Sequence, residues 1–296
     1  MIGAGPYRSA SAGDSEEGVP LLALRPLQWE WREAPPPPGV VLEGHEIGLT
    51  PEAWRYLADR LTPLPPGWPQ EVHGELQISV KCLVLAAGMG APPRFGDGDW
   101  LLLSQPDEVA DLSALLLNPH GVHFLNHARH SRRSSWHWQQ RVAGIHALLE
   151  RRELSPSGVL IDAGLVLELY GIRRARGIVL LSLEDVGEWE TPFRAGDDLL
   201  IHHGQSKQQL INDPRYHLVV DGLKFIAFHQ LKYLKQRRRR LVDLNDLAMM
   251  RALEEGRSWR LYLGRWLDVG LVSVSMLQHS VSRLAYRVGL RAGRGA

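Results

Sequence analysis

Residues 160–183 of the chain read LIDAGLVLELYGIRRARGIVLLSL, and the fold prediction starts from this stretch. Apolar runs of strand length begin near Val159 and again at Gly177. Between them, residues 164–170 predict a short helix that starts at a small residue and ends before Gly171. Strand, helix and strand in so few residues predict a compact α+β unit.

Residues 216–228 predict a β-hairpin downstream of this unit. Two β-rich runs, 216–220 and 223–228, are separated by Asp221-Gly222, a pair that favours a type I′ turn because both central residues need positive φ. Helices are predicted over residues 230–240 and 243–254, and a long one from residue 258. Upstream, the pattern predicts a helix after Thr50, strands over 76–87 and 100–104, and helices over 108–118 and 134–152.

The sequence divides into four segments. Residues 1–40 are rich in Gly, Ser and Pro and predict a mostly disordered lead, with enough apolar residues at 21–31 to dock on a neighbouring surface. Residues 41–118 predict an N-terminal α/β portion, and residues 119–256 a core. Residues 257–296 predict a basic amphipathic C-terminal helix.

Composition restricts the class of protein. The chain has 296 residues, of which 44% are hydrophobic and 23% charged, as expected for a soluble globular protein. Its one cysteine, Cys82, excludes an internal disulfide and reads as a small buried side chain. No apolar run has the length of a membrane span, and the first twenty residues carry acidic side chains. A cytoplasmic location is therefore expected, with a peripheral position at a membrane as the alternative.

Charge is unevenly distributed. Residues 1–200 hold 17 Lys/Arg against 26 Asp/Glu, whereas residues 201–296 hold 17 against 7. The basic part could meet nucleotide phosphates or an anionic membrane. Few aromatic side chains stand among its cations, which argues against sequence-specific nucleic-acid recognition. In the last helix, apolar residues 277, 281, 284 and 288 and arginines 283, 287, 291 and 294 form separate faces. These faces suit a membrane surface or a protein partner, or packing within the chain.

Two further motifs each have a functional interpretation and a purely structural one. The turn Gly88-Met89-Gly90 could cradle a phosphate, but two prolines follow it and an ordinary turn is favoured. His123, His127 and His130 would share one face of a helix at a spacing able to hold a metal ion. No acidic residue lies between positions 111 and 150 to complete such a site, so packing histidines are the alternative.

Residues 160–183 resemble the DNA polymerase beta-type nucleotidyltransferases, whose members share a strand, a helix of this length and a corner like Tyr170-Gly171-Ile172-Arg173. A second part, LINDPRYHLVVDGLKFIAFHQLKYLKQRRRRLVDLNDL at 210–247, is similar to a C-terminal block of divergent members encoded near glycan and polysaccharide biosynthesis genes. The resemblance covers roughly residues 120–250. It implies a mixed sheet flanked by helices, in an α+β protein with an N-terminal α/β portion.

The resemblance also implies where chemistry would occur. Members of this superfamily carry an Asp-x-Asp pair on the second strand, which holds divalent ions against nucleotide phosphates. Here those positions are Gly177 and Val179, which cannot ligate a metal. The remaining weak candidates for catalytic carboxylates are Asp162, Glu184, Asp185 and Asp221, and the cations expected to contact phosphate are Arg173, Arg176 and Lys224.

The sequence therefore predicts a degenerate nucleotidyltransferase-like protein, a pseudoenzyme that binds a nucleotide or sugar phosphate as an accessory in glycan or polysaccharide biosynthesis. No cofactor is expected in that case. One alternative is an active nucleotidyl- or glycosyl-phosphate transferase that uses other carboxylates and Mg²⁺. The other is a module that binds a membrane or a protein through the C-terminal helix.

Overall fold

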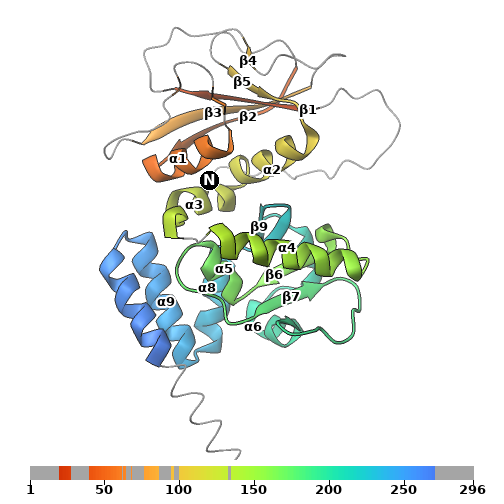
Figure 1. Ribbon diagram of the computed structural model, residues 1–296, viewed down its shortest axis with the longest axis vertical. Helices are drawn as coiled ribbons and strands as arrows, with labels where there is room; N and C mark the ends of the chain where they lie inside the picture. Colours follow the sequence, from red (N-terminus) through yellow and green to blue (C-terminus); the bar gives the residue numbers. More distant parts are fainter. Residues whose placement is uncertain are drawn as a thin grey trace, which may run out of the picture.

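The chain folds as an α+β protein with two separate five-stranded sheets (Figure 1). The computed structural model describes residues 20–27, 40–61, 63, 64, 68, 77–86, 95, 96, 100–132 and 135–270. The predicted Gly-rich turn at 88–90 and the C-terminal residues 271–296 lie outside these ranges. No helix within the described ranges is both long enough and apolar enough to cross a membrane.

The first sheet is antiparallel throughout, and its central strand comes from the predicted disordered lead. Strand β1 pairs with β3 on one side and β5 on the other, and residues 21–24 are buried. The prediction of a mostly disordered segment 1–40 was therefore wrong for residues 20–26. Cys82 is buried in this sheet, as predicted, and burial raises the pKa of its thiol to about 12. The order is β2 (Val40–Leu49), β3 (Ile78–Ala86), β1 (Pro20–Pro26), β5 (Trp100–Leu103) and β4 (Phe95–Gly96).

Helices lie between the two sheets, next to the first of them (Figure 1). Helix α1 (Pro51–Arg60) starts where the sequence predicts, because the Thr50 side chain accepts a hydrogen bond from the Ala53 amide and proline occupies the first helical position. The predicted helix over 108–118 is α2 (Pro106–Leu116). It ends just before Asn118-Pro119, and Asn118 caps a separate helix, α3 (Pro119–His127), by accepting a hydrogen bond from the His120 amide. Helix α3 contacts elements of both sheets.

The second sheet is mixed and contains the stretch with which the sequence prediction began. Strand β6 is parallel to β10 and antiparallel to β7, which is in turn parallel to β8. The predicted hairpin is confirmed: β9 and β10 pair antiparallel around Asp221 and Gly222, with φ of 53° and 72°. The order is β8 (Phe193–Ala195), β7 (Ile178–Ser182), β6 (Val159–Asp162), β10 (Leu223–Ile226) and β9 (His217–Val220).

Helices surround this second sheet and share one core with it, in which Tyr170 and Phe225 are fully buried. The last three helical segments, α8, α9 and residues 258–270, lie side by side at one edge of the molecule (Figure 1). The helices are α4 (Ser135–Arg151), α5 (Gly164–Leu169), α6 (Leu200–His203), α7 (Lys207–Asn212), α8 (Phe228–Arg238) and α9 (Leu241–Glu254). Single 3-10 turns occupy His130–Arg132, Pro156–Gly158 and Asp197–Leu199.

Candidate functional site

The end of β7 does not line an open cleft. Strand β7 is buried over its whole length, and Val179 pairs with Asp162 on β6. A small apolar cluster of Ala163, Val179, Leu199 and Leu234 fills the space next to this pair. Leu199, from the 3-10 turn after β8, and Leu234, from α8, therefore cover Val179, one of the two positions at which the superfamily carries its Asp-x-Asp pair.

Asp162 is a buried residue with a histidine partner. Its Oδ2 lies 2.8 Å from His203 Nε2, and both side chains are completely buried. Its other carboxylate oxygen accepts a hydrogen bond from the Ala163 amide, where the backbone turns with φ of 58°. Gln230 Nε2 donates to the His203 carbonyl at 2.8 Å. Both oxygens of this carboxylate are thus engaged in internal hydrogen bonds, which together with Gln230 connect β6, α6 and α8.

The other candidate carboxylates lie at the opposite end of the sheet. The register pairs Val159 with Ser182, so Glu184 and Asp185 follow β7 at the end where β6 begins. Asp185 accepts a hydrogen bond from the Gly187 amide in an exposed turn. Asp221 stands at the same end, because β10 runs parallel to β6. The four predicted carboxylates therefore do not converge on one site.

Asp221 connects the second sheet to the helices next to the first. Its two carboxylate oxygens accept hydrogen bonds from Arg60 on α1, at 2.7 Å, and from the indole of Trp138 on α4, at 2.8 Å. The His146 ring lies 3.1 Å from its carbonyl oxygen. These contacts give Asp221 a structural role in the hairpin turn.

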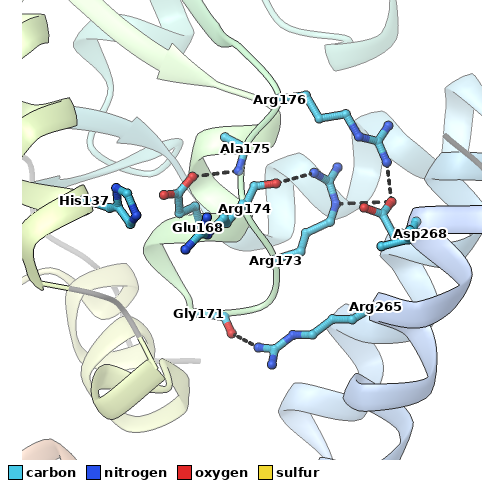
Figure 2. A pocket seen from close by; sticks show the side chains of 10 residues that line it. His137, Glu168, Gly171, Arg173, Arg174, Ala175, Arg176, Arg265 and Asp268 are labelled. Atoms are coloured by element: carbon cyan, nitrogen blue, oxygen red, sulfur yellow. Dashed lines mark hydrogen bonds and ion pairs between the residues drawn. The ribbon is translucent and has the colours of Figure 1, made fainter. Parts of the chain in front are cut away.

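Arginines gather instead around a cavity of about 460 Å³ beside the turn between α5 and β7. Figure 2 shows Arg173 and Arg176, both predicted as phosphate contacts, directed toward Asp268. Asp268 comes from the helix over 258–270, which also contributes Arg265. The lining consists of His137, Glu168, Gly171, Arg173, Arg174, Ala175, Arg176, Arg265, Asp268 and Val269.

Arg173 is held firmly on the inner side of this cavity. Its guanidinium makes a two-pronged pair with Asp246, at 2.7 Å and 2.9 Å, and Lys235 reaches the same carboxylate at 2.7 Å. Burial by itself would raise the pKa of Asp246, but the Arg173 hydrogen bond and the Lys235 charge hold that pKa below its usual value. Arg173 is therefore fixed in position before any ligand arrives.

Arg174 also lines the cavity, and it is exposed. Its guanidinium has no hydrogen bond or ion pair with the residues that the structure describes. Glu168 is already occupied: its carboxylate accepts from the Ala175 amide at 2.6 Å and pairs with Arg141 at 3.2 Å. Four arginines and two carboxylates line the cavity, so cations are in excess there.

Lys224 does not join Arg173 and Arg176. It projects from β10, where its ammonium donates to the carbonyls of Ser157 at 2.7 Å and Ile211 at 2.9 Å. Burial lowers the pKa of this lysine. Of the three predicted phosphate contacts, Arg173 and Arg176 lie together beside Asp268. The third, Lys224, instead connects α7 to the 3-10 turn before β6 through its two hydrogen bonds.

The predicted histidine face is not formed. Helix α3 ends at His127, and His130 stacks on Tyr56 with its Nε2 bonded to the Leu125 carbonyl. His123 and His127 do stack, with ring centroids 4.3 Å apart, and His123 bonds the Tyr170 hydroxyl. Within the described ranges, no three His, Cys, Asp or Glu side chains are arranged to hold a metal ion.

Sequence reasoning missed Arg174, Arg265 and Asp268 as partners in one cavity. A signal existed for two of them, since Arg265 and Asp268 are three residues apart on a predicted helix and so share a face. It also missed His203, whose pairing with Asp162 has no local signature. Comparison of the chain with protein-family models, with curated proteins and with solved structures finds no match.

Proposed function

We propose that the protein binds a phosphorylated small molecule, a nucleotide or a sugar phosphate, in the arginine-lined cavity, and that it does not transfer a phosphoryl or nucleotidyl group. The proposal rests above all on Arg174, whose exposed guanidinium faces the cavity with no described partner while three further arginines surround it. Guanidinium groups match phosphate oxygens in pairs, which makes such a cluster suited to phosphate.

The size and charge of the cavity support this class of ligand. A volume of about 460 Å³ lies within the range of small-molecule sites. Arg173 and Arg265 are anchored by protein partners and provide a fixed cationic wall, whereas Arg174 is available to a ligand. A phosphate entering near Arg176 would compete with Asp268, the carboxylate that now pairs with it.

We expect no phosphoryl or nucleotidyl transfer because the carboxylates that would hold divalent ions are missing. Metal-assisted nucleotidyl transfer needs two or three carboxylates around divalent ions. The family positions for them are Gly177 and Val179, and Val179 lies in an apolar cluster. Among the described residues, the carboxylates that line the cavity are Glu168 and Asp268, and both are paired with arginines. Ligand binding should therefore be independent of Mg²⁺.

A degenerate nucleotidyltransferase-like fold is the architecture we propose for residues 119–256. A strand, a short helix and an antiparallel strand in a mixed sheet are what the sequence resemblance implies. The same resemblance suggests an accessory role in glycan or polysaccharide biosynthesis.

Calorimetric titration of the full chain tests the ligand class. The probes are a nucleoside triphosphate, a nucleoside diphosphate sugar, a sugar phosphate and inorganic phosphate, each with and without Mg²⁺. At least one organic phosphate should bind, and Arg174→Gln should weaken it about tenfold or more, because a charge-assisted hydrogen bond contributes roughly 1.5–3 kcal/mol. Arg194→Gln, which removes an equally exposed arginine from β8, should leave the Kd unchanged.

Two results would overturn the proposal. One is that none of the probes binds, or that Arg174→Gln binds as tightly as the wild type. The other is tight binding that requires Mg²⁺, together with transfer of a labelled phosphoryl or nucleotidyl group, which would establish the transferase alternative.

A further inference from the structure

The helix over residues 258–270 is attached to the protein mainly through small and polar residues. Leu261 is buried in the core, and Gly264 lies so close to Met249 that an added Cβ would be 2.3 Å from its Cγ. The Gly264 carbonyl accepts a hydrogen bond from Asn245 at 2.8 Å. Arg265 and Asp268 point toward the α5–β7 turn (Figure 2). Positions 261, 264, 265 and 268 thus form the inward side of this helix.

Large apolar side chains occupy the other side of the same helix. Trp259, Leu263, Trp266 and Leu267 form what we call the outward face, and they are 62%, 53%, 77% and 53% exposed. Their spacing of four, three and one residues places them together on the helix surface. A helix normally turns such residues toward the core, so a contiguous exposed group of this kind marks an interaction surface.

Basic side chains stand next to apolar ones at the corner where α8 meets α9. Arg239 and Arg240 are exposed there, followed by Leu241 and Leu244, which are also exposed. This corner leads into α9, the helix that packs against residues 258–270. Beyond Asp268 the sequence has four arginines and no acidic residue. The predicted apolar and arginine faces at 277–294 lie outside the described residues.

We infer that the outward face binds an anionic membrane surface. Tryptophan is the side chain most suited to the boundary between lipid headgroups and acyl chains. Arg260 flanks this face, with its guanidinium over the Trp259 ring, and an arginine beside an apolar face adds attraction to negatively charged lipid. Charge also favours a membrane over a second copy of this chain, because Asp268, the one acid among residues 258–270, is paired on the inward side and cannot meet the Arg260 of another copy.

Vesicle co-sedimentation of the full chain tests this inference. Phosphatidylcholine vesicles that contain phosphatidylserine should retain the protein, pure phosphatidylcholine vesicles should retain much less, and added salt should release it. The double variant Trp259→Ser/Trp266→Ser should lower the partition coefficient about tenfold or more, since each tryptophan buries a large apolar area. Trp136→Ser, a similarly exposed tryptophan on α4, is the matched control and should bind like the wild type.

Circular dichroism and thermal unfolding of the double variant should match the wild type, since both tryptophans are exposed. Equal vesicle binding by the double variant, or no binding of the wild type to phosphatidylserine vesicles, would overturn the inference. So would sedimentation equilibrium showing a dimer that the double variant loses while neither protein binds vesicles. That last result would assign the outward face to a second copy.

Discussion

Val179 occupies a position at which a carboxylate would bind a metal ion, and its apolar side chain makes that impossible. It points into an apolar cluster with Ala163, Leu199 and Leu234, and an added Cβ on Gly196 would lie 2.7 Å from its Cγ1. The packing around Val179 leaves no room for a hydrated metal ion. Restoring a carboxylate there would add a buried charge and would not recreate a metal site.

Val179→Asp should therefore lower the free energy of unfolding by roughly 3–5 kcal/mol at neutral pH, the cost of a buried charge with no partner. Urea unfolding measures this. Burial would raise the pKa of the new carboxyl above its unfolded value, so the loss should shrink as the pH falls and the group becomes neutral.

Val179→Ala separates charge from lost packing. It should cost less than Val179→Asp and show no added pH dependence. If Val179→Asp is as stable as Val179→Ala at neutral pH, the strand end is open to solvent and the packing argument fails.

At the scale of elements, helices α3 and α8 meet through histidines. The rings of His120 and His229 stack with centroids 4.7 Å apart, and His123 packs against Phe228. Burial, followed by the charges of His127 and other nearby histidines, lowers the pKa of His123 to about 4. Burial also lowers the pKa values of His120 and His229. The contact between these helices is thus formed by neutral imidazoles.

We expect this contact to weaken in acid. In an unfolded chain histidine takes up a proton near pH 6.5, whereas His123 in the folded protein does so only near pH 4. Between these values the unfolded state binds more protons, so stability falls as the pH drops from about 6.5 toward 4. His123→Phe, which keeps an aromatic ring, should reduce this slope of Tm against pH.

The control is Trp136→Phe, an exchange of one exposed aromatic side chain on α4 for another that removes no titratable group and should leave the slope unchanged. Some slope should remain in His123→Phe, because burial also lowers the pKa of His217 to about 4. A slope identical to that of the wild type would show that His123 does not contribute to acid sensitivity.

Elements with local signals were predictable from the sequence. Helix α1 has its cap and proline side by side, and the β9–β10 hairpin has Asp221-Gly222 at its turn. The α+β class followed from the pattern at 160–183, whereas the mixed second sheet was implied only by the family resemblance. Strand β1 was missed because prolines bound it and its partners lie far along the chain.

The cavity could not be predicted in full, because it depends on how a distant helix packs. Arg173 and Arg176 were identified from their own turn, but Asp268 reaches them only through the contact of residues 258–270 with α9. The separation of the four candidate carboxylates could not be predicted for a related reason. Strand register, which places Asp162 and Asp221 at opposite ends, is not visible in spacing alone.

At the scale of the whole molecule, the first sheet depends on its N-terminal strand. β1 lies between β3 and β5, and its residues Leu22 and Leu24 are fully buried in the core beneath α1 and α2. Deletion of residues 1–27 should therefore unfold the N-terminal portion, since it exposes two strand edges and part of a core. Limited proteolysis and circular dichroism would report the loss of strand structure and rapid cleavage within residues 40–103.

Deletion of residues 1–18 alone retains β1 and is the control, because it removes the residues before the strand and leaves the strand itself. If both deletions are equally stable, β1 is dispensable and the sheet closes without it.

The position of β1 also has a consequence for synthesis on the ribosome. Of the described strands of this sheet, β1 is synthesised first, yet Leu24 pairs with Cys82 and Leu22 with Leu103. Its apolar residues must remain unpaired until both later strands have left the exit tunnel, and contacts so distant in sequence form slowly. The strand of this sheet that is made first is thus among the last to acquire both of its neighbours. Until residue 103 has been translated and has left the tunnel, the apolar residues of β1 are open to non-native association.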